Sequence, residues 1–175
     1  MRFSVDIRDT EIADLVQDLL QITGQEPWTR RFEWLTRESR DNPLMEDWLM
    51  ARCAIEWSMR EILANPSLHS GRPMRLDNPG KIEPVGFATG IERCHKRFSE
   101  RGRRRLRGVL LDGLKEEKGL LSVQREIRTE HHLLSRGFDV EFQDQEYGGG
   151  VDFIARKDDV EIEVECKLFS ADLGR

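Results

Sequence analysis

GGGVDFIARKDDVEIEVECK, residues Gly148–Lys167, has the pattern of a β-hairpin and decides the fold of the C-terminal region. Two apolar runs flank the dipeptide Asp158-Asp159, and aspartate is common in tight turns. In the second run, apolar residues alternate with charged ones, so three glutamates and a lysine share one face of the predicted strand. The other face is apolar and is expected to pack.

The turn determines which residues of the two strands face each other. A two-residue turn at this dipeptide, or a four-residue turn centred on it, places Asp152 opposite Glu165 and Gly150 opposite Lys167. Directly opposed side chains lie about 5 Å apart at Cβ, where like charges destabilise a sheet. Asp152 and Glu165 therefore need either a cation between them or a raised pKa.

Such a cluster has the chemistry for phosphodiester hydrolysis. The carboxylates of Asp152 and Glu165 are hard oxygen ligands of the kind that Mg²⁺ binds. A bound Mg²⁺ polarises a phosphate and lowers the pKa of its water, while Lys167 would neutralise developing charge or position the attacking water. The alternative is a solvated edge strand, whose alternating charges serve only solubility.

The same residues resemble the active-site motif of the PD-(D/E)xK nucleases, a superfamily with the restriction-endonuclease-like fold. The resemblance covers residues 119–175: a helix with an acidic residue, a strand, Asp152 on a second strand, and Glu165-Cys166-Lys167 on a third. It implies that Asp152, Glu165 and the backbone carbonyl of Cys166 bind Mg²⁺, or Mn²⁺ in its place. It also implies that Lys167 is catalytic.

The acid on the preceding helix is assigned by position. Glu126 and Glu130 lie one turn apart beside the apolar stripe. Glu126 is favoured as the catalytic acid because it lies about three turns before Gly137, where the helix is expected to end. Either glutamate is also compatible with a flank charge of an amphipathic helix.

Two features depart from the superfamily pattern. Val151 occupies the position of the usual proline before the aspartate. Members of the superfamily continue after the third strand with a helix and another strand, whereas this sequence ends at Arg175. We therefore expect either a further C-terminal segment or a second subunit to complete the sheet. A further segment is favoured, because an open apolar strand face invites aggregation.

Residues 1–118 have mostly helical patterns, interrupted by a proline-rich stretch. Four of the six prolines fall within residues 65–85, which predicts a long loop acting as a lid, an interaction arm or a linker. The predicted elements are a strand at 3–7, helices at 10–24, 43–65, 86–101, 103–118 and 120–136, and strands at 138–142, 151–155 and 160–167.

The net charge of −5 hides a segregated distribution. Eight lysines and arginines but one acid lie between Arg93 and Arg107, a density that fits contact with a phosphate backbone. A solvated helix face that pairs with acidic residues of the same chain fits the pattern equally well. The predicted nucleic-acid-binding residues are Arg97, Arg101, Arg103, Arg104, Arg105 and Arg107.

Other distinctive residues have plainer interpretations. The four tryptophans precede the predicted loop and could stack on bases, but their spacing favours core or interface packing. The three cysteines lack the spacing of a disulfide framework or a zinc site, and His131 and His132 are expected to flank a helix. A cytoplasmic location is expected, because the N-terminal pattern is not that of a signal peptide and no run reaches membrane-spanning length.

The sequence thus predicts an α+β protein with two regions. Residues 1–118 form a mostly helical region, and residues 119–175 form an αβββ nuclease-like core with a mixed sheet. The expected function is Mg²⁺-dependent hydrolysis of nucleic acid, with DNA favoured over RNA. Two alternatives stay open: a catalytically inactive nucleic-acid-binding module with this fold, and a protein-interaction domain built on the helical region.

Overall fold

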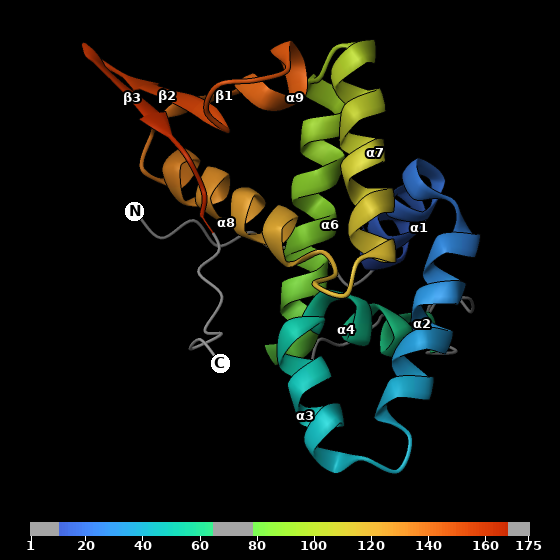
Figure 1. Ribbon diagram of the computed structural model, residues 1–175. Coiled ribbons are helices and arrows are strands. Elements are labelled where there is room, and N and C mark those ends of the chain that lie inside the picture. Colours follow the sequence, from blue (N-terminus) through green and yellow to red (C-terminus); the bar gives the residue numbers. More distant parts are fainter. Residues whose placement is uncertain (1–10, 65–78, 168–175) are drawn as a thin grey trace.

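The computed structural model describes residues 11–64 and 79–167, and Figure 1 shows a body of packed helices with a small sheet at one end. The body contains α1 (Glu11–Thr23), α2 (Gln25–Ser39), α3 (Pro43–Arg52), α4 (Ala54–Leu63), α6 (Pro79–Arg97) and α7 (Glu100–Lys115). The C-terminal part contains α8 (Leu121–Ser135), β1 (Asp139–Phe142), α9 (Gln143–Tyr147), β2 (Phe153–Lys157) and β3 (Val160–Val164). The predicted α+β class, with helices first and a sheet last, is confirmed.

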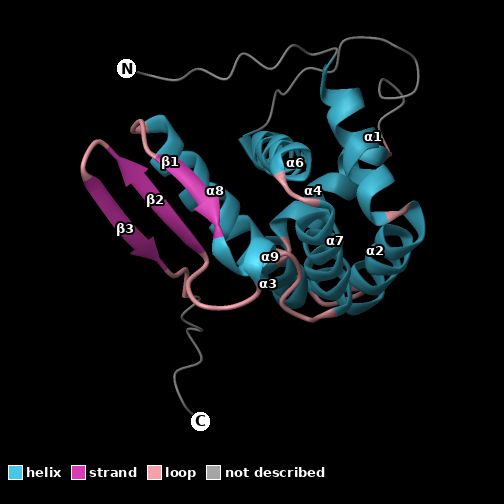
Figure 2. Ribbon diagram, turned by 90° about the horizontal axis from the view of Figure 1, so that it is seen from above, coloured by secondary structure: helices cyan, strands magenta, loops and turns pink. Residues whose placement is uncertain are grey.

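The described sheet has the order β1-β2-β3 and is antiparallel throughout, so the predicted mixed sheet is not found within the described residues. The reason is local, because a two-residue turn joins β2 to β3 and only α9 and a glycine turn join β1 to β2. Connections this short return the chain antiparallel to the previous strand. Figure 2 shows α8 along one face of this sheet.

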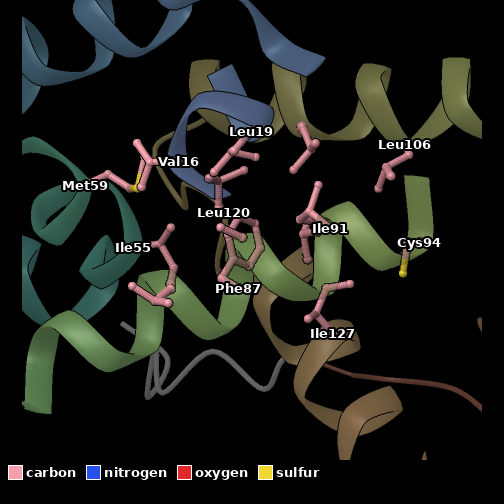
Figure 3. Packing of buried hydrophobic residues seen from close by; sticks show 14 of the residues in the cluster. Val16, Leu19, Ile55, Met59, Phe87, Ile91, Cys94, Leu106, Leu120 and Ile127 are labelled. Atoms are coloured by element: carbon pink, nitrogen blue, oxygen red, sulfur yellow. The ribbon is translucent and has the colours of Figure 1, made fainter. Parts of the chain in front are cut away.

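One hydrophobic core runs from the helical body into the sheet. Figure 3 shows the packing of part of this core among the helices. The core extends from Ile12 on α1 to Ala155 on β2 without a break at the predicted boundary between residues 118 and 119. Three aromatic rings join the two parts: Phe98 and Phe142 lie 5.3 Å apart in an edge-to-face arrangement, as do Phe142 and Phe153. Each such pair contributes about 1 kcal/mol beyond area burial, so the sheet is fixed to the helices.

A buried ion pair ties three helices together. The guanidinium of Arg31 on α2 lies 3.3 Å from a carboxylate oxygen of Glu56 on α4, and both side chains are almost fully buried. Arg31 also donates a 2.8 Å hydrogen bond to the carbonyl of Glu116, and Glu56 accepts a 3.0 Å bond from the backbone N–H of Leu120. These bonds hold the α7–α8 turn against α2 and α4.

The single helix predicted over residues 43–65 is wrong, because the chain breaks at Cys53 between α3 and α4. Cys53 has φ −113° and ψ 41° and is fully buried. The break allows Leu49, Cys53 and Trp57 to pack with Leu35 in a second, smaller core cluster. Tertiary packing therefore overrides the continuous helical pattern.

The predicted loop over residues 65–85 is wrong at its end, because α6 already begins at Pro79 and contains Pro84. The helix persists because Val85, Ala88 and Ile91 recur at helical spacing and are buried. The predicted strand at 3–7 and residues 65–78 of the predicted loop lie outside the described residues.

The break predicted at Gly102 lies instead at Ser99, which caps the N-terminus of α7 by accepting a hydrogen bond from the backbone N–H of Gly102. Gly102 is inside the helix and has a packing role. A Cβ at this position would lie 2.4 Å from a carboxylate oxygen of Glu146, so a larger residue would displace this carboxylate from its present position. Glu146 in turn accepts a 2.7 Å hydrogen bond from the backbone N–H of Ser99.

Candidate functional site

The hairpin of β2 and β3 has the predicted register. Phe153 pairs with Val164, and Lys157 pairs with Val160 across the two-residue turn. Asp158 adopts the left-handed conformation there, with φ 52°, which aspartate tolerates better than most residues. The alternation of the two strands places Asp152 and Glu165 just beyond the last paired residues.

Asp152 is bonded to the segment that carries the predicted catalytic residues. Its Oδ2 atom accepts a hydrogen bond from the backbone N–H of Cys166. Lys167 donates from Nζ to a carboxylate oxygen of Glu165, and this contact raises the pKa of Lys167, with a smaller contribution from the charge of Asp152. Asp152, Glu165 and Lys167 therefore lie at one end of the hairpin, with Asp152 half-buried and the other two exposed.

Glu126 and Glu130 face different partners although they lie on the same helix. Burial, together with the smaller effect of the negative charges of Asp152 and Asp144, raises the pKa of Glu126 to about 7. Glu130 is 1% exposed and pairs with Arg93 of α6 through both carboxylate oxygens. Glu126 is thus the helical acid beside Asp152, whereas Glu130 holds α8 against α6.

Cys166 lies between these groups on the packed side of the hairpin. Its side chain is half-buried against the main core. Burial raises the pKa of its thiol, the Thr129 hydroxyl opposes this shift, and the charges of Asp152 and Glu126 reinforce it. A thiol of this kind stays protonated at neutral pH, so the group of Cys166 available to a metal ion is its backbone carbonyl and not a thiolate.

The residues fit a divalent cation in chemical type. Asp152, Glu165 and Glu126 supply carboxylate oxygens. The pKa of Glu126 is raised first by burial and second by the charges of Asp152 and Asp144, and a cation would offset only the effect of these charges. Within residues 11–64 and 79–167, however, no three histidine, cysteine, aspartate or glutamate side chains converge closely enough to hold a metal ion. Glu165 instead pairs with Lys167. Metal binding would therefore require Glu165 to exchange this partner.

Asp144 was missed by sequence reasoning. It lies on α9, an element that the sequence did not predict, and its charge contributes to the raised pKa of Glu126. Its only signal in the sequence is its place two residues after a strand, within Gln143–Tyr147. The short helix α9 packs against α7 and brings the charge of Asp144 near enough to act on Glu126, which a linear pattern does not reveal.

The predicted nucleic-acid-binding arginines are directed to several parts of this chain. Arg97 lies 3.3 Å from the carbonyl of Val140, and Arg103 donates a 2.7 Å bond to the carbonyl of His95. The other contacts are Arg104 to Glu100, Arg105 to the carbonyl of Asp144 and Arg107 to the carbonyl of Ile22. Most of these guanidiniums thus stabilise strand or helix carbonyls, while Arg101 is exposed and makes no hydrogen bond with any described residue.

A cleft of about 590 Å³ lies where α6, α7, β1 and α9 meet. Arg97, Arg103 and Lys96 contribute positive charge to it. The four acids that line it are Glu130, Asp139, Glu141 and Glu146. Their charges offset the cations, so this cleft does not favour a phosphate.

The tryptophans divide between the core and the surface. Trp28 and Trp57 are buried, as the spacing predicted, and the Trp28 indole donates a 2.8 Å bond to the Thr23 hydroxyl. Trp48 is 40% exposed, and Trp34 is half-buried beneath Arg31. His131 and His132 are exposed on α8, as expected for flank residues.

Comparison of the chain with protein-family models, curated proteins and solved structures found no match. Among the described helices, none combines the length and the apolar character needed to cross a lipid bilayer.

Glu126→Gln is expected to stabilise the protein above pH 7, by about 2 kcal/mol in the presence of EDTA. Below its ordinary pKa of 4.5, Glu126 is protonated in both states and the substitution has no effect. As the pH rises towards about 7, the unfolded chain ionises first, so the folded wild type loses stability that the variant keeps. Urea unfolding at pH 5 and pH 8 measures the difference.

Glu163→Gln is the matched control, because Glu163 is exposed on β3 and the charge change is the same. It is expected to shift stability by less than about 0.5 kcal/mol at both pH values. A pH-independent effect of Glu126→Gln would show that the pKa of Glu126 is not raised.

Proposed function

We propose that the protein is a metal-dependent nuclease that hydrolyses phosphodiester bonds, with DNA favoured over RNA as substrate. The observation that supports this best is the hydrogen bond from the backbone N–H of Cys166 to Asp152. It joins the aspartate to the Glu165-Cys166-Lys167 segment, and Glu126 provides a third carboxylate beside Asp152. These are the residues whose pattern resembles the PD-(D/E)xK nucleases.

The proposal assigns a separate role to each residue. Asp152, Glu165 and the backbone carbonyl of Cys166 would hold Mg²⁺, or Mn²⁺ in its place. The chemistry supplied by the bound ion is polarisation of the phosphate and a lowered pKa for its water. Glu126, with its pKa raised to about 7, can accept a proton near neutral pH.

Lys167 would neutralise charge at the phosphate. Its ammonium group already lies against Glu165, so release from that carboxylate would turn it towards an anionic substrate. Burial does not restrain it, because its side chain is 64% exposed. An exposed ion pair of this kind contributes little stability, so Lys167 can leave the Glu165 carboxylate for a phosphate at a small cost in free energy.

The direct test is cleavage of linear duplex, circular duplex, single-stranded DNA and RNA with Mg²⁺ or Mn²⁺. The proposal expects metal-dependent products that EDTA abolishes, and about 100-fold slower cleavage by Lys167→Ala. Lys157→Ala is the control, because Lys157 is exposed on the same hairpin and its removal leaves the Glu165-Cys166-Lys167 segment intact. No cleavage by the wild type, or equal cleavage by Lys167→Ala, refutes the proposal.

A second candidate is a catalytically inactive nucleic-acid-binding module with the same fold. It is favoured by one observation, that the described acids do not converge into a group able to hold a metal ion. Calorimetric titration with Mg²⁺ separates the candidates. Salt-sensitive binding of nucleic acid without Mg²⁺ binding selects the inactive module.

An open strand face bears on possible partners. Val160 and Ile162 of β3 are 54% and 36% exposed, although they alternate with charged residues as a packing face would. The proposal therefore includes a further segment or a second subunit that covers this face. Sedimentation of the protein with and without nucleic acid tests the second subunit.

A further inference from the structure

A cleft of about 290 Å³ lies between α2 and the C-terminal end of α7. We call it the α2–α7 cleft. Its lining combines cations with an indole ring and apolar side chains. The lining residues are Pro27, Arg30, Arg31, Trp34, Leu114 and Lys115.

Arg31 is the most buried of these side chains, and one of its donors lacks a hydrogen-bond partner among the described residues. Arg31 is 2% exposed, and its terminal nitrogens are engaged by Glu56, Cys53 and the carbonyl of Glu116. Its Nε atom is buried and finds no hydrogen-bond partner within residues 11–64 and 79–167. A buried unpaired donor costs about 1–3 kcal/mol, and because this atom has almost no accessible surface, a ligand acceptor would reach it only after a movement of the lining.

Aromatic and apolar surface adjoins this donor. The guanidinium carbon of Arg31 lies 4.4 Å from the centre of the Trp34 ring, and the half-buried indole forms part of the lining. Pro27 and Leu114 add apolar surface. A flat ring lying against such a lining gains stacking and burial.

Two further cations at the cleft are exchangeable. Arg30 pairs with Glu26 at 2.6 Å and Lys115 pairs with Asp112 at 3.1 Å, and all four side chains are largely exposed. Exposed pairs of this kind contribute between 0 and about 1 kcal/mol, so a dianionic phosphate competes well for both cations. The α2–α7 cleft thus places an indole ring that can stack on a planar ligand next to two cations that can neutralise a phosphate.

We propose that the α2–α7 cleft binds a nucleotide, with the base against Trp34 and the phosphate near Arg30 and Lys115. The volume suits a single small ligand, because about 290 Å³ is at the lower end of small-molecule pockets. The ligand is either a free nucleotide or one unit of a single strand. The inference does not depend on the proposed nuclease activity, because the acidic residues of that site lie on α8, just before β2 and just after β3.

The test is fluorescence anisotropy of a labelled oligothymidylate of about ten nucleotides, in EDTA so that no cleavage occurs. Trp34→Leu is expected to weaken binding about tenfold or more, and Lys115→Gln about threefold. Lys115 is exposed, so its variant stays informative if Trp34→Leu affects folding. Lys118→Gln is the matched control, with the same charge change outside the lining, and is expected to weaken binding less than about twofold.

Competitors distinguish the sources of the ligand. Displacement by thymidine monophosphate indicates a free nucleotide, whereas displacement by unlabelled oligonucleotide alone indicates one unit of a strand. The proposal is overturned if inorganic phosphate or a polyglutamate peptide competes as well as the nucleotide, because the base would then not be recognised. It is also overturned if neither the oligonucleotide nor thymidine monophosphate binds, or if Trp34→Leu and Lys115→Gln both bind as the wild type does. Because the assay is run in EDTA, where the proposed cleavage does not occur, its result is separate from the outcome of the cleavage assay.

Discussion

Replacing Asp152 by asparagine is expected to slow Mg²⁺-dependent cleavage by about 1,000-fold. The substitution removes the charge of the best-placed acid and with it about 4 kcal/mol of stabilisation in the transition state. Asparagine keeps an oxygen that can accept the hydrogen bond from Cys166, so the hairpin should persist. Initial rates on the preferred substrate at saturating Mg²⁺ measure the effect.

Two further measurements attribute this loss to the metal site rather than to folding. Calorimetry should show Mg²⁺ binding by the wild type and none by Asp152→Asn. The free energy of unfolding in EDTA should differ by less than about 1 kcal/mol. Glu163→Gln removes an equivalent charge from the exposed face of β3 and should retain cleavage. Normal cleavage by Asp152→Asn would exclude the proposed site.

The hairpin was predictable because its signals are local. Strict alternation on β3 and an aspartate that accepts a positive φ at the turn set the register, and the register places Asp152 beside Cys166. A slip by one residue would turn the buried side chains of β1 or β2 to the exposed face, so the pattern favours one pairing. The α+β class followed from the same alternation after a series of helical patterns.

The remaining features depend on residues far apart in the sequence. Glu126 and Glu130 have equivalent positions in the helical pattern, and only the buried contact between Glu130 and Arg93 separates their roles. The break at Cys53 likewise has no glycine or proline signal. It coincides with a contact between the Cys53 sulfur and Arg31, 3.1 Å apart, which a linear pattern does not show.

The basic segment shows the same limitation. Its density of arginines predicted a phosphate contact, yet Arg103, Arg105 and Arg107 donate hydrogen bonds to backbone carbonyls of α6, α9 and α1. Guanidinium groups suit this role because they offer several donors and carry a charge that complements a helix C-terminus. Composition alone does not distinguish the two uses.

Glu56→Ala is expected to cost about 3–5 kcal/mol of stability, the largest effect of any single substitution that we predict. The substitution leaves the buried guanidinium of Arg31 without its counter-ion, 3.3 Å away in the wild type. It also removes the acceptor of the backbone N–H of Leu120 at the start of α8. Urea unfolding at pH 7 measures the loss.

Two companion variants separate the charge from the hydrogen bonds. Glu56→Gln keeps an oxygen for Leu120 and should cost less than the alanine variant. The double variant Arg31→Met, Glu56→Leu removes both charges and should recover part of the loss, because an apolar pair often replaces a buried ion pair without penalty. Recovery should remain incomplete, since Arg31 also holds the carbonyl of Glu116 at 2.8 Å. A cost below about 1 kcal/mol for Glu56→Ala would mean that this ion pair does not hold the α7–α8 turn in place.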